Sequence, residues 1–167
     1  MTQTDDPSAP SGHPYGGEIE LERAGWAELQ ALSRQLGPAQ RLEPGYYVDP
    51  DWSVRDVVGH IGAWLAEGKS QLERITTGTY DRHEVDIDAL NARFLDAMRD
   101  QPWDLVRLQA TAARHAMLAA WFGLDARSAE ADWWVRKCGA DHYGEHLPRL
   151  REWVAELRGR TGPSTRR

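Results

Sequence analysis

The chain of 167 residues lacks most features of secreted, membrane and nucleic-acid-binding proteins. Its single cysteine, Cys138, cannot form an internal disulfide, which fits a reducing cytosol. No apolar run approaches the roughly 18 residues of a membrane-spanning helix, and residues 1–16 lack the basic start and apolar stretch of a secretion signal. Lys and Arg number 20 against 26 Asp and Glu and form no basic face. We therefore expect a cytoplasmic protein that binds neither nucleic acid nor membranes.

Common catalytic motifs are also missing. The sequence contains no Gly-rich phosphate loop, no G-x-S-x-G elbow and no convincing Cys–His nucleophile pair. These absences exclude the usual nucleotide-binding and hydrolase classes. Apolar residues nowhere alternate convincingly at period two, so strands are not expected.

What the chain does contain is apolar spacing typical of helices. Residues 1–16 and 160–167 are rich in Gly, Pro, Ser, Thr and charged residues, and predict loose tails around one helical domain at 17–159. Helices are predicted at 19–37, 53–75, 86–99, 102–123 and 128–158. Ser53 with Asp56 three residues later resembles a capping box at a helix start. The sequence thus predicts an all-α, four-helix bundle with a short extra helix.

Three details of this bundle are specific enough to check. Pro148 is expected to bend the last helix or to begin a new one. The polar connection at 76–85 is longer than a hairpin needs and indicates a crossing over the bundle. The inward stripe expected for the helix at 102–123 is Leu105, Leu108, Ala112, Leu118 and Phe122.

The stretch HYGEH at 142–146 points to metal chemistry. His142 and His146 stand four residues apart, so on a helix their rings lie on one face and could bind one ion at ~2.1 Å. This face is the inward seam of the last predicted helix, which runs through Trp134, Cys138, His142, His146, Leu150, Trp153 and Leu157. Two inward imidazoles are costly to bury unless a partner satisfies them.

His60 supports the same interpretation from another helix. It lies three residues after Val57 and four before Trp64, both on the predicted buried stripe of 53–75. Three inward histidines from two helices are typical of a divalent metal site in a bundle, and three protein ligands leave positions open for water or substrate. The alternative is that each histidine is a hydrogen-bonded core residue.

Several further residues are candidates for binding or catalysis. Glu145 and Asp141 could orient an imidazole or move a proton, or could be solvated helix carboxylates. Arg93 could hold a substrate carboxylate or lie on the surface. Asn91, His115 and Trp64 are predicted to line a small-molecule pocket, and Cys138 either lines it or packs as a small apolar residue.

Three segments resemble the DinB-like superfamily: DWSVRDVVGHIGAW at 51–64, DIDALNARF at 86–94 and DHYGEHLPRLREW at 141–153. The similarity extends over about residues 18–158. It implies a four-helix bundle in up-down-down-up order and one divalent ion, zinc or nickel, held by His60, His142 and His146.

The resemblance also suggests activities. The superfamily includes a mycothiol-dependent isomerase domain, thiol S-transferases and a cyclopropane hydrolase that gives self-resistance. We expect a metal-dependent enzyme that transfers a low-molecular-weight thiol to a small electrophile. The alternatives are a hydrolase-like or sequestering resistance protein, and a non-enzymatic binding module stabilised by metal. The composition permits a homodimer.

Overall fold

The computed structural model describes residues 16–47, 51–81, 86–126 and 128–160, and over these ranges the chain is helical with no strand. The expected tails lie outside the described residues, except for Gly16 and Arg160 at the ends of the first and last helices. The helices are α1 (Gly16–Arg34), α2 (Pro38–Leu42), α3 (Val54–Thr76), α4 (Ile87–Met98), α5 (Trp103–Phe122), α6 (Ala129–Cys138) and α7 (Ala140–Arg160). None of the described helices is long and apolar enough to cross a membrane.

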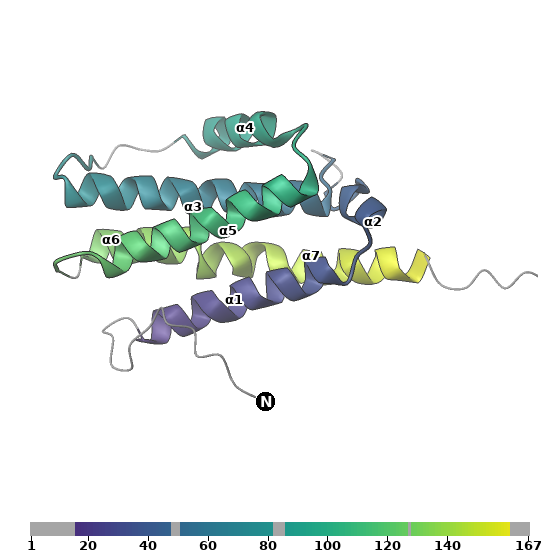
Figure 1. Ribbon diagram of the computed structural model, residues 1–167, viewed down its shortest axis with the longest axis horizontal. Coiled ribbons are helices and arrows are strands. Elements are labelled where there is room, and N and C mark those ends of the chain that lie inside the picture. The colour runs from purple at the N-terminus through teal and green to yellow at the C-terminus, as the bar shows by residue number, and fades with distance from the viewer. Residues whose placement is uncertain (1–15, 48–50, 82–85, 127, 161–167) are drawn as a thin grey trace, which may run out of the picture.

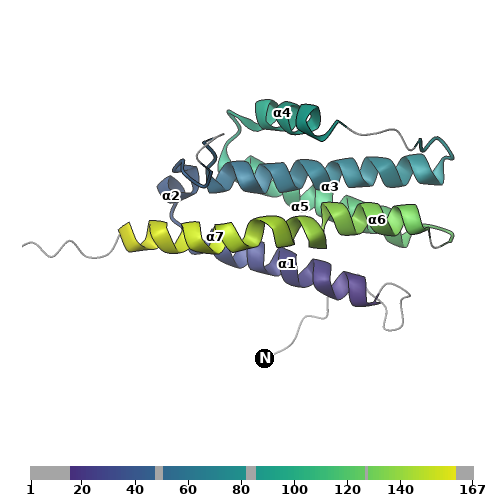
Figure 2. The ribbon, with the colours of Figure 1, turned by 180° about the vertical axis from the view of Figure 1, so that it is seen from behind.

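Four rows of helix lie side by side and form the bundle: α1, α3, α5, and α6 followed by α7 (Figures 1 and 2). The helices α3 and α5 run in one direction, while α1 and the α6–α7 row run in the other. The short helix α4 lies on the outside of α3 and returns the chain between the two parallel helices. The most extensive packing is between α3 and α5, with α3 also against α6, and α1 against α7. The prediction of a helical bundle is confirmed.

The helix α3 begins where the capping box predicts. The Asp56 carboxylate accepts hydrogen bonds from the backbone N–H of Ser53 (2.8 Å) and from its hydroxyl (2.6 Å). In return the Ser53 Oγ accepts from the backbone N–H of Asp56. This box fixes the first turn of α3, and with it the rotation of the helix that carries His60.

Glycines on α3 allow its close approach to α5. A Cβ on Gly62 would lie 2.8 Å from the Cα of Ala110, and one on Gly59 would overlap Met98 and approach Val106. Only a residue without a side chain fits at such contacts. Small residues on one face of α3 therefore allow the close contact between α3 and α5.

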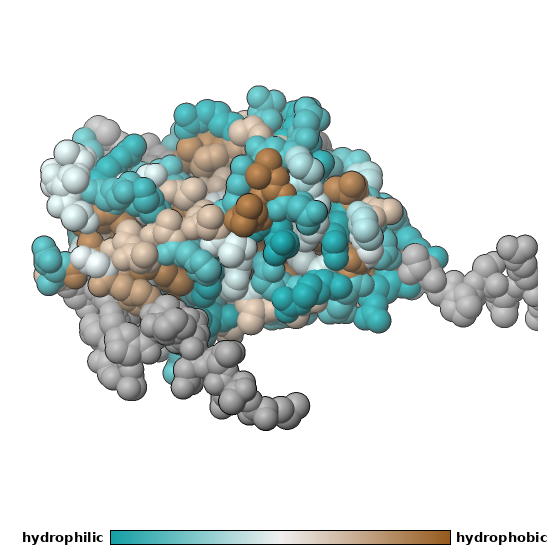
Figure 3. Space-filling model, in the orientation of Figure 1, coloured by the Kyte–Doolittle hydropathy of each residue, from teal (hydrophilic) through white to brown (hydrophobic). Residues whose placement is uncertain are grey.

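The stripe predicted for α5 is wrong in most of its positions. Leu105, Leu108 and Ala112 are exposed, and Leu108 has an exposed fraction of 61%. Figure 3 shows hydrophobic residues on this face of the molecule, over α5 and its neighbours. Of the predicted residues only Leu118 is fully buried, with Phe122 partly buried. The buried face instead comprises Val106, Ala110, Arg114, Met117, Leu118 and Trp121. A charged residue in the middle of that face concealed it in the sequence.

Arg114 can be buried because it is fully paired. Its guanidinium donates from Nε to Oε1 of Glu22 at 2.7 Å and from Nη2 to Oε2 at 2.5 Å. The Tyr143 hydroxyl donates to Oε1 of the same carboxylate at 2.9 Å, and the Trp26 ring lies 5.4 Å from the Arg114 Cζ. Bidentate pairing of this kind satisfies both buried charges. These residues link α1, α5 and α7.

The last predicted helix is interrupted at Gly139, not at Pro148. Gly139 separates α6 from α7 with φ −104° and ψ −104°, and a Cβ there would lie 2.8 Å from the carbonyl oxygen of Val135. The helix α7 continues through Pro148, whose side chain is exposed. The prediction that a new helix begins at Pro148 is therefore wrong. Gly139 leaves room for a neighbouring carbonyl because it has no side chain. Composition alone does not show which glycine of a sequence ends a helix in this way.

We expect Gly62→Ala to destabilise the fold by about 1–3 kcal/mol, because the added methyl group forces α3 and α5 apart. Gly144→Ala is the matched control: it is exposed inside α7 with no heavy atom within 4 Å of an added Cβ. It should stabilise the protein by about 0.5–1 kcal/mol. Urea denaturation measures both. Equal stabilities of the two variants would contradict the close α3–α5 contact.

Arg114→Met should destabilise the protein by about 3–5 kcal/mol, because the Glu22 carboxylate stays buried without its cation. The double variant E22Q/R114M leaves no buried charge and should recover most of the loss. Thermal unfolding of the two variants beside the parent checks this coupling. A double variant that is less stable than R114M would show that the ion pair is not the source of the effect.

Candidate metal centre

The three histidines predicted as ligands are brought together inside the bundle. His60 comes from the second turn of α3, and His142 and His146 from the first two turns of α7. Their exposed fractions are 5%, 6% and 6%. The inward seam is confirmed throughout, since its members are all buried: Trp134, Cys138, His142, His146, Leu150, Trp153 and Leu157.

The three rings meet at their Nε2 atoms. Nε2 of His142 lies 3.0 Å from Nε2 of His60 and 3.1 Å from Nε2 of His146. One ring nitrogen from each histidine lies within 4.8 Å of the others. In the described part of the chain, this is the only group of three or more such side chains close enough to share an ion.

Tyr46, in the loop before α3, contacts His146 at two groups. Its hydroxyl lies 3.0 Å from the backbone carbonyl oxygen of His146 and 3.2 Å from Nδ1 of the same residue. A carbonyl oxygen can only accept, so the hydroxyl donates to it. Burial raises the pKa of Tyr46 well above its usual value, so the hydroxyl keeps its proton. With Nδ1 held on this side, the Nε2 of His146 faces His142.

His142 is the histidine that the other two share, because its Nε2 contacts the Nε2 of both. An imidazole Nε2 carries either one proton or one lone pair, so it can make one of these two hydrogen bonds but not both.

These contacts fit a metal ion better than they fit hydrogen bonds. Each Nε2 has one in-plane position, taken either by a proton or by a lone pair. The Nε2 of His142 lies 3.0–3.1 Å from two other such nitrogens and can pair with only one of them, whereas a shared cation would satisfy all three. Two nitrogens each ~2.1 Å from a tetrahedral ion lie about 3.4 Å apart, close to the observed separations.

Burial keeps the three imidazoles neutral. Loss of solvation, with a smaller contribution from the neighbouring histidines, lowers the pKa of His142 to about 2 and that of His60 to about 3. Burial also lowers the pKa of His146. Neutral imidazoles are the form that binds metal, so protons compete weakly for these nitrogens near neutral pH.

Aromatic side chains surround the histidines. The Trp52 ring lies 4.9 Å from the His60 ring, and the Trp64 ring lies 6.1 Å from the His142 ring. Trp64 is held in place by its Nε1, which donates to the Asn91 side chain on α4 at 2.9 Å. Trp64 thus lies beside His142, and Asn91 contacts the Trp64 indole. That these two residues line a small-molecule pocket stays a prediction.

The loop before α3 contributes residues that sequence reasoning missed. Tyr47 lies with its hydroxyl 3.2 Å from Nδ1 of His146, and Tyr46 and Trp52 contact the same ring. The backbone carbonyl of Trp52 accepts from the N–H groups of Gly45 and Tyr46, which fixes the loop. The feature of the sequence that could have identified these residues is a pair of tyrosines and a tryptophan in an otherwise polar Pro/Gly segment.

The remaining candidates lie away from the three histidines. His115 is exposed on α5, so the prediction that it faces the cavity is wrong, for the same reason as the α5 stripe. Arg93 is exposed on α4. Glu145 is exposed and ion-paired with Lys137 at 2.7 Å. Cys138 is buried beside Gly68, where burial raises the pKa of its thiol to about 12, and it packs as a small apolar residue.

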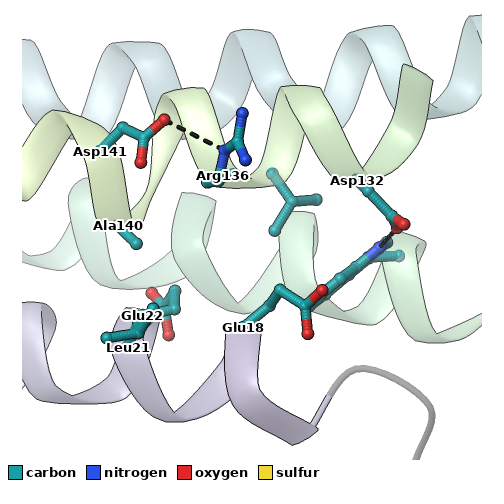
Figure 4. A pocket seen from close by; sticks show the side chains of 9 residues that line it. Glu18, Leu21, Glu22, Asp132, Arg136, Ala140 and Asp141 are labelled. Carbon is teal, nitrogen blue, oxygen red and sulfur yellow. Dashed lines mark hydrogen bonds and ion pairs between the residues drawn. The ribbon is translucent and has the colours of Figure 1, made fainter. Parts of the chain in front are cut away.

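A separate cavity of about 50 Å³ lies between α1, α5, α6 and α7 (Figure 4). Asp141 borders it and pairs with Arg136 at 3.2 Å, so this carboxylate does not orient an imidazole. The volume holds only a few waters, and no histidine of the metal centre lines it. Its lining residues are Glu18, Leu21, Glu22, Trp121, Asp132, Val135, Arg136, Ala140 and Asp141.

We expect Tyr46→Phe to weaken metal affinity by about 10- to 100-fold while one ion is still bound, because His146 loses a hydrogen-bond partner that orients its ring. Competition of Co²⁺-loaded protein with a chelator measures the affinity. Tyr80→Phe is the control, since this half-buried tyrosine lies at the far end of α3 and contacts Trp134. Unchanged Co²⁺ affinity in Tyr46→Phe would contradict a role of Tyr46 in orienting the ligand.

No family model matches this sequence, and no curated protein matches it. Among solved structures, the chain is similar to an uncharacterised protein from Escherichia coli UTI89. The TM-score is 0.67 at 12% sequence identity, over 84% of this chain and 92% of that chain. At this identity the likeness shows the fold alone, and it supports the assignment of the chain as a helical bundle.

Proposed function

We propose that the protein is a metal-dependent enzyme of the DinB-like type that transfers a low-molecular-weight thiol, such as mycothiol, to a small electrophile. The observation that carries the proposal is the convergence of three buried imidazoles, in which the Nε2 of His142 lies 3.0 Å from that of His60 and 3.1 Å from that of His146. The helix directions agree with the up-down-down-up order that the DinB-like resemblance implies.

The ligand set indicates the kind of ion and the room left around it. His60, His142 and His146 would supply three nitrogen ligands, a set that suits zinc or nickel and leaves at least one position for another ligand. When bound, such an ion lowers the pKa of a thiol that coordinates it and so supplies a thiolate near neutral pH.

The protein's own residues would orient the ligands and limit water. Tyr46 and Tyr47 hold the Nδ1 side of the His146 ring, so that its Nε2 faces His142. The indoles of Trp52 and Trp64 cover the imidazoles from two sides. Glu145 and Arg93 have no part in this proposal, because one is paired with Lys137 and both are exposed.

One observation favours a second candidate, a binding module in which the ion mainly supports the fold. All three histidines are at least 94% buried, which is also typical of structural metal sites. The two candidates differ in whether the ion accepts an exchangeable ligand and accelerates a reaction.

The proposed enzyme is tested with metal-loaded protein, mycothiol and a chromogenic electrophile. We expect a rate above the uncatalysed reaction that falls to background in His142→Ala, because a ligand is lost. His115→Ala is the matched control: it also removes a histidine, but an exposed one on α5, and should keep the parent's rate.

The outcomes separate the two candidates. A parent rate equal to that of His142→Ala would overturn thiol transfer. If chelation also lowers the melting temperature sharply while no rate is seen, the result supports the binding module.

A further inference from the structure

We propose that the indole N–H of Trp52 is a hydrogen-bond donor for the exchangeable ligand of the metal centre, and that the centre therefore selects anionic ligands with a hydrogen-bond acceptor. This inference rests on the proposed metal centre. The inference adds to that centre a residue that determines specificity and a class of ligand.

Trp52 carries a buried donor without a partner. The side chain is 7% exposed, and its Nε1 makes no hydrogen bond within the described ranges of the chain. Its backbone carbonyl, in contrast, accepts from the N–H groups of Gly45 and Tyr46. Buried polar groups in proteins are nearly always paired, so an unpaired one calls for an explanation such as a ligand that is bound in function.

The position of the ring connects this donor with the metal centre. The Trp52 indole lies 4.9 Å from the ring of His60 and stacks at 26° on that of His146, 6.5 Å away. The ring of Tyr47 also lies beside the Trp52 indole, with 5.4 Å between the ring centroids. The unpaired donor therefore belongs to a side chain that contacts two of the three metal ligands.

The charge of the centre favours the same class of ligand. Its protein ligands are three imidazoles, which bind a metal ion in their neutral form, with no carboxylate or thiolate among them. A divalent ion held in this way keeps its full charge of two, which attracts an anion in the open position. A thiolate or a carboxylate would satisfy both the ion and the indole N–H.

A second tryptophan offers a matched control. Trp153 is also buried and its Nε1 is also unpaired in the described structure. Its ring, however, lies between the guanidinium groups of Arg149 (5.4 Å) and Arg160 (4.9 Å), further along α7 from the metal centre. Phe in place of either tryptophan removes the N–H and retains an aromatic ring.

The test compares the full-length Co²⁺-loaded parent with W52F and W153F. Two probes are titrated and followed by visible absorption: azide, an anion that accepts hydrogen bonds, and imidazole, a neutral ligand whose remaining ring nitrogen donates. We expect the Kd of azide to rise about 10-fold or more in W52F, the loss of one hydrogen bond to a charged group. The Kd of imidazole should change less than about 2-fold, and W153F should match the parent for both probes.

Each other result has a definite meaning. Unchanged azide binding in W52F, or an equal loss for both probes, would overturn the role of the indole N–H, because the second pattern shows only altered packing. Failure of the parent to bind Co²⁺ would overturn the metal centre itself, and with it this inference. Co²⁺ binding is measured first, so the two failures are distinguished.

Discussion

The structure depends on one crowded contact, in which the Nε2 of His142 lies 3.0 Å from that of His60 and 3.1 Å from that of His146. Only one of these two contacts can be a hydrogen bond of His142, because its Nε2 carries either a single proton or a single lone pair. Burial lowers the pKa of all three rings, so they stay neutral near neutral pH. A shared cation would satisfy all three Nε2 atoms, and on this ground we propose a metal centre here and not a set of core histidines.

The rest of the fold holds these three rings in place. The capping box at Ser53 and Asp56 fixes the start of α3, and the glycine face of α3 sets its distance from α5. Gly139 ends α6 one turn before His142, so α7 begins with the two turns that carry His142 and His146. On the opposite side, the buried pair of Glu22 and Arg114 with Tyr143 ties α7 to α1 and α5. Tyr143 therefore anchors one face of the helix whose other face carries His142.

Much of this could be predicted from the sequence, because apolar residues at helical spacing identify a helix and its buried face. The histidines of α3 and α7 stand in unbroken apolar seams, and so their inward direction was correct. The buried face of α5 was predicted wrongly, because Arg114 lies in its middle and the partner of Arg114, Glu22, is 92 residues away in sequence. The short helix α2 and the aromatic loop at Tyr46, Tyr47 and Trp52 were missed for a related reason. Their positions depend on tertiary contacts with α7 and α3, which local periodicity does not report.

X-ray absorption spectroscopy on untagged protein, with elemental analysis of the same sample, tests the central claim most directly. The account predicts close to one zinc or nickel ion per chain, with about three imidazole nitrogens at ~2.0–2.1 Å and one further light-atom or sulfur ligand. Protein that is free of metal and does not take up zinc or nickel would contradict it. So would a bound ion whose spectrum lacks imidazole scattering.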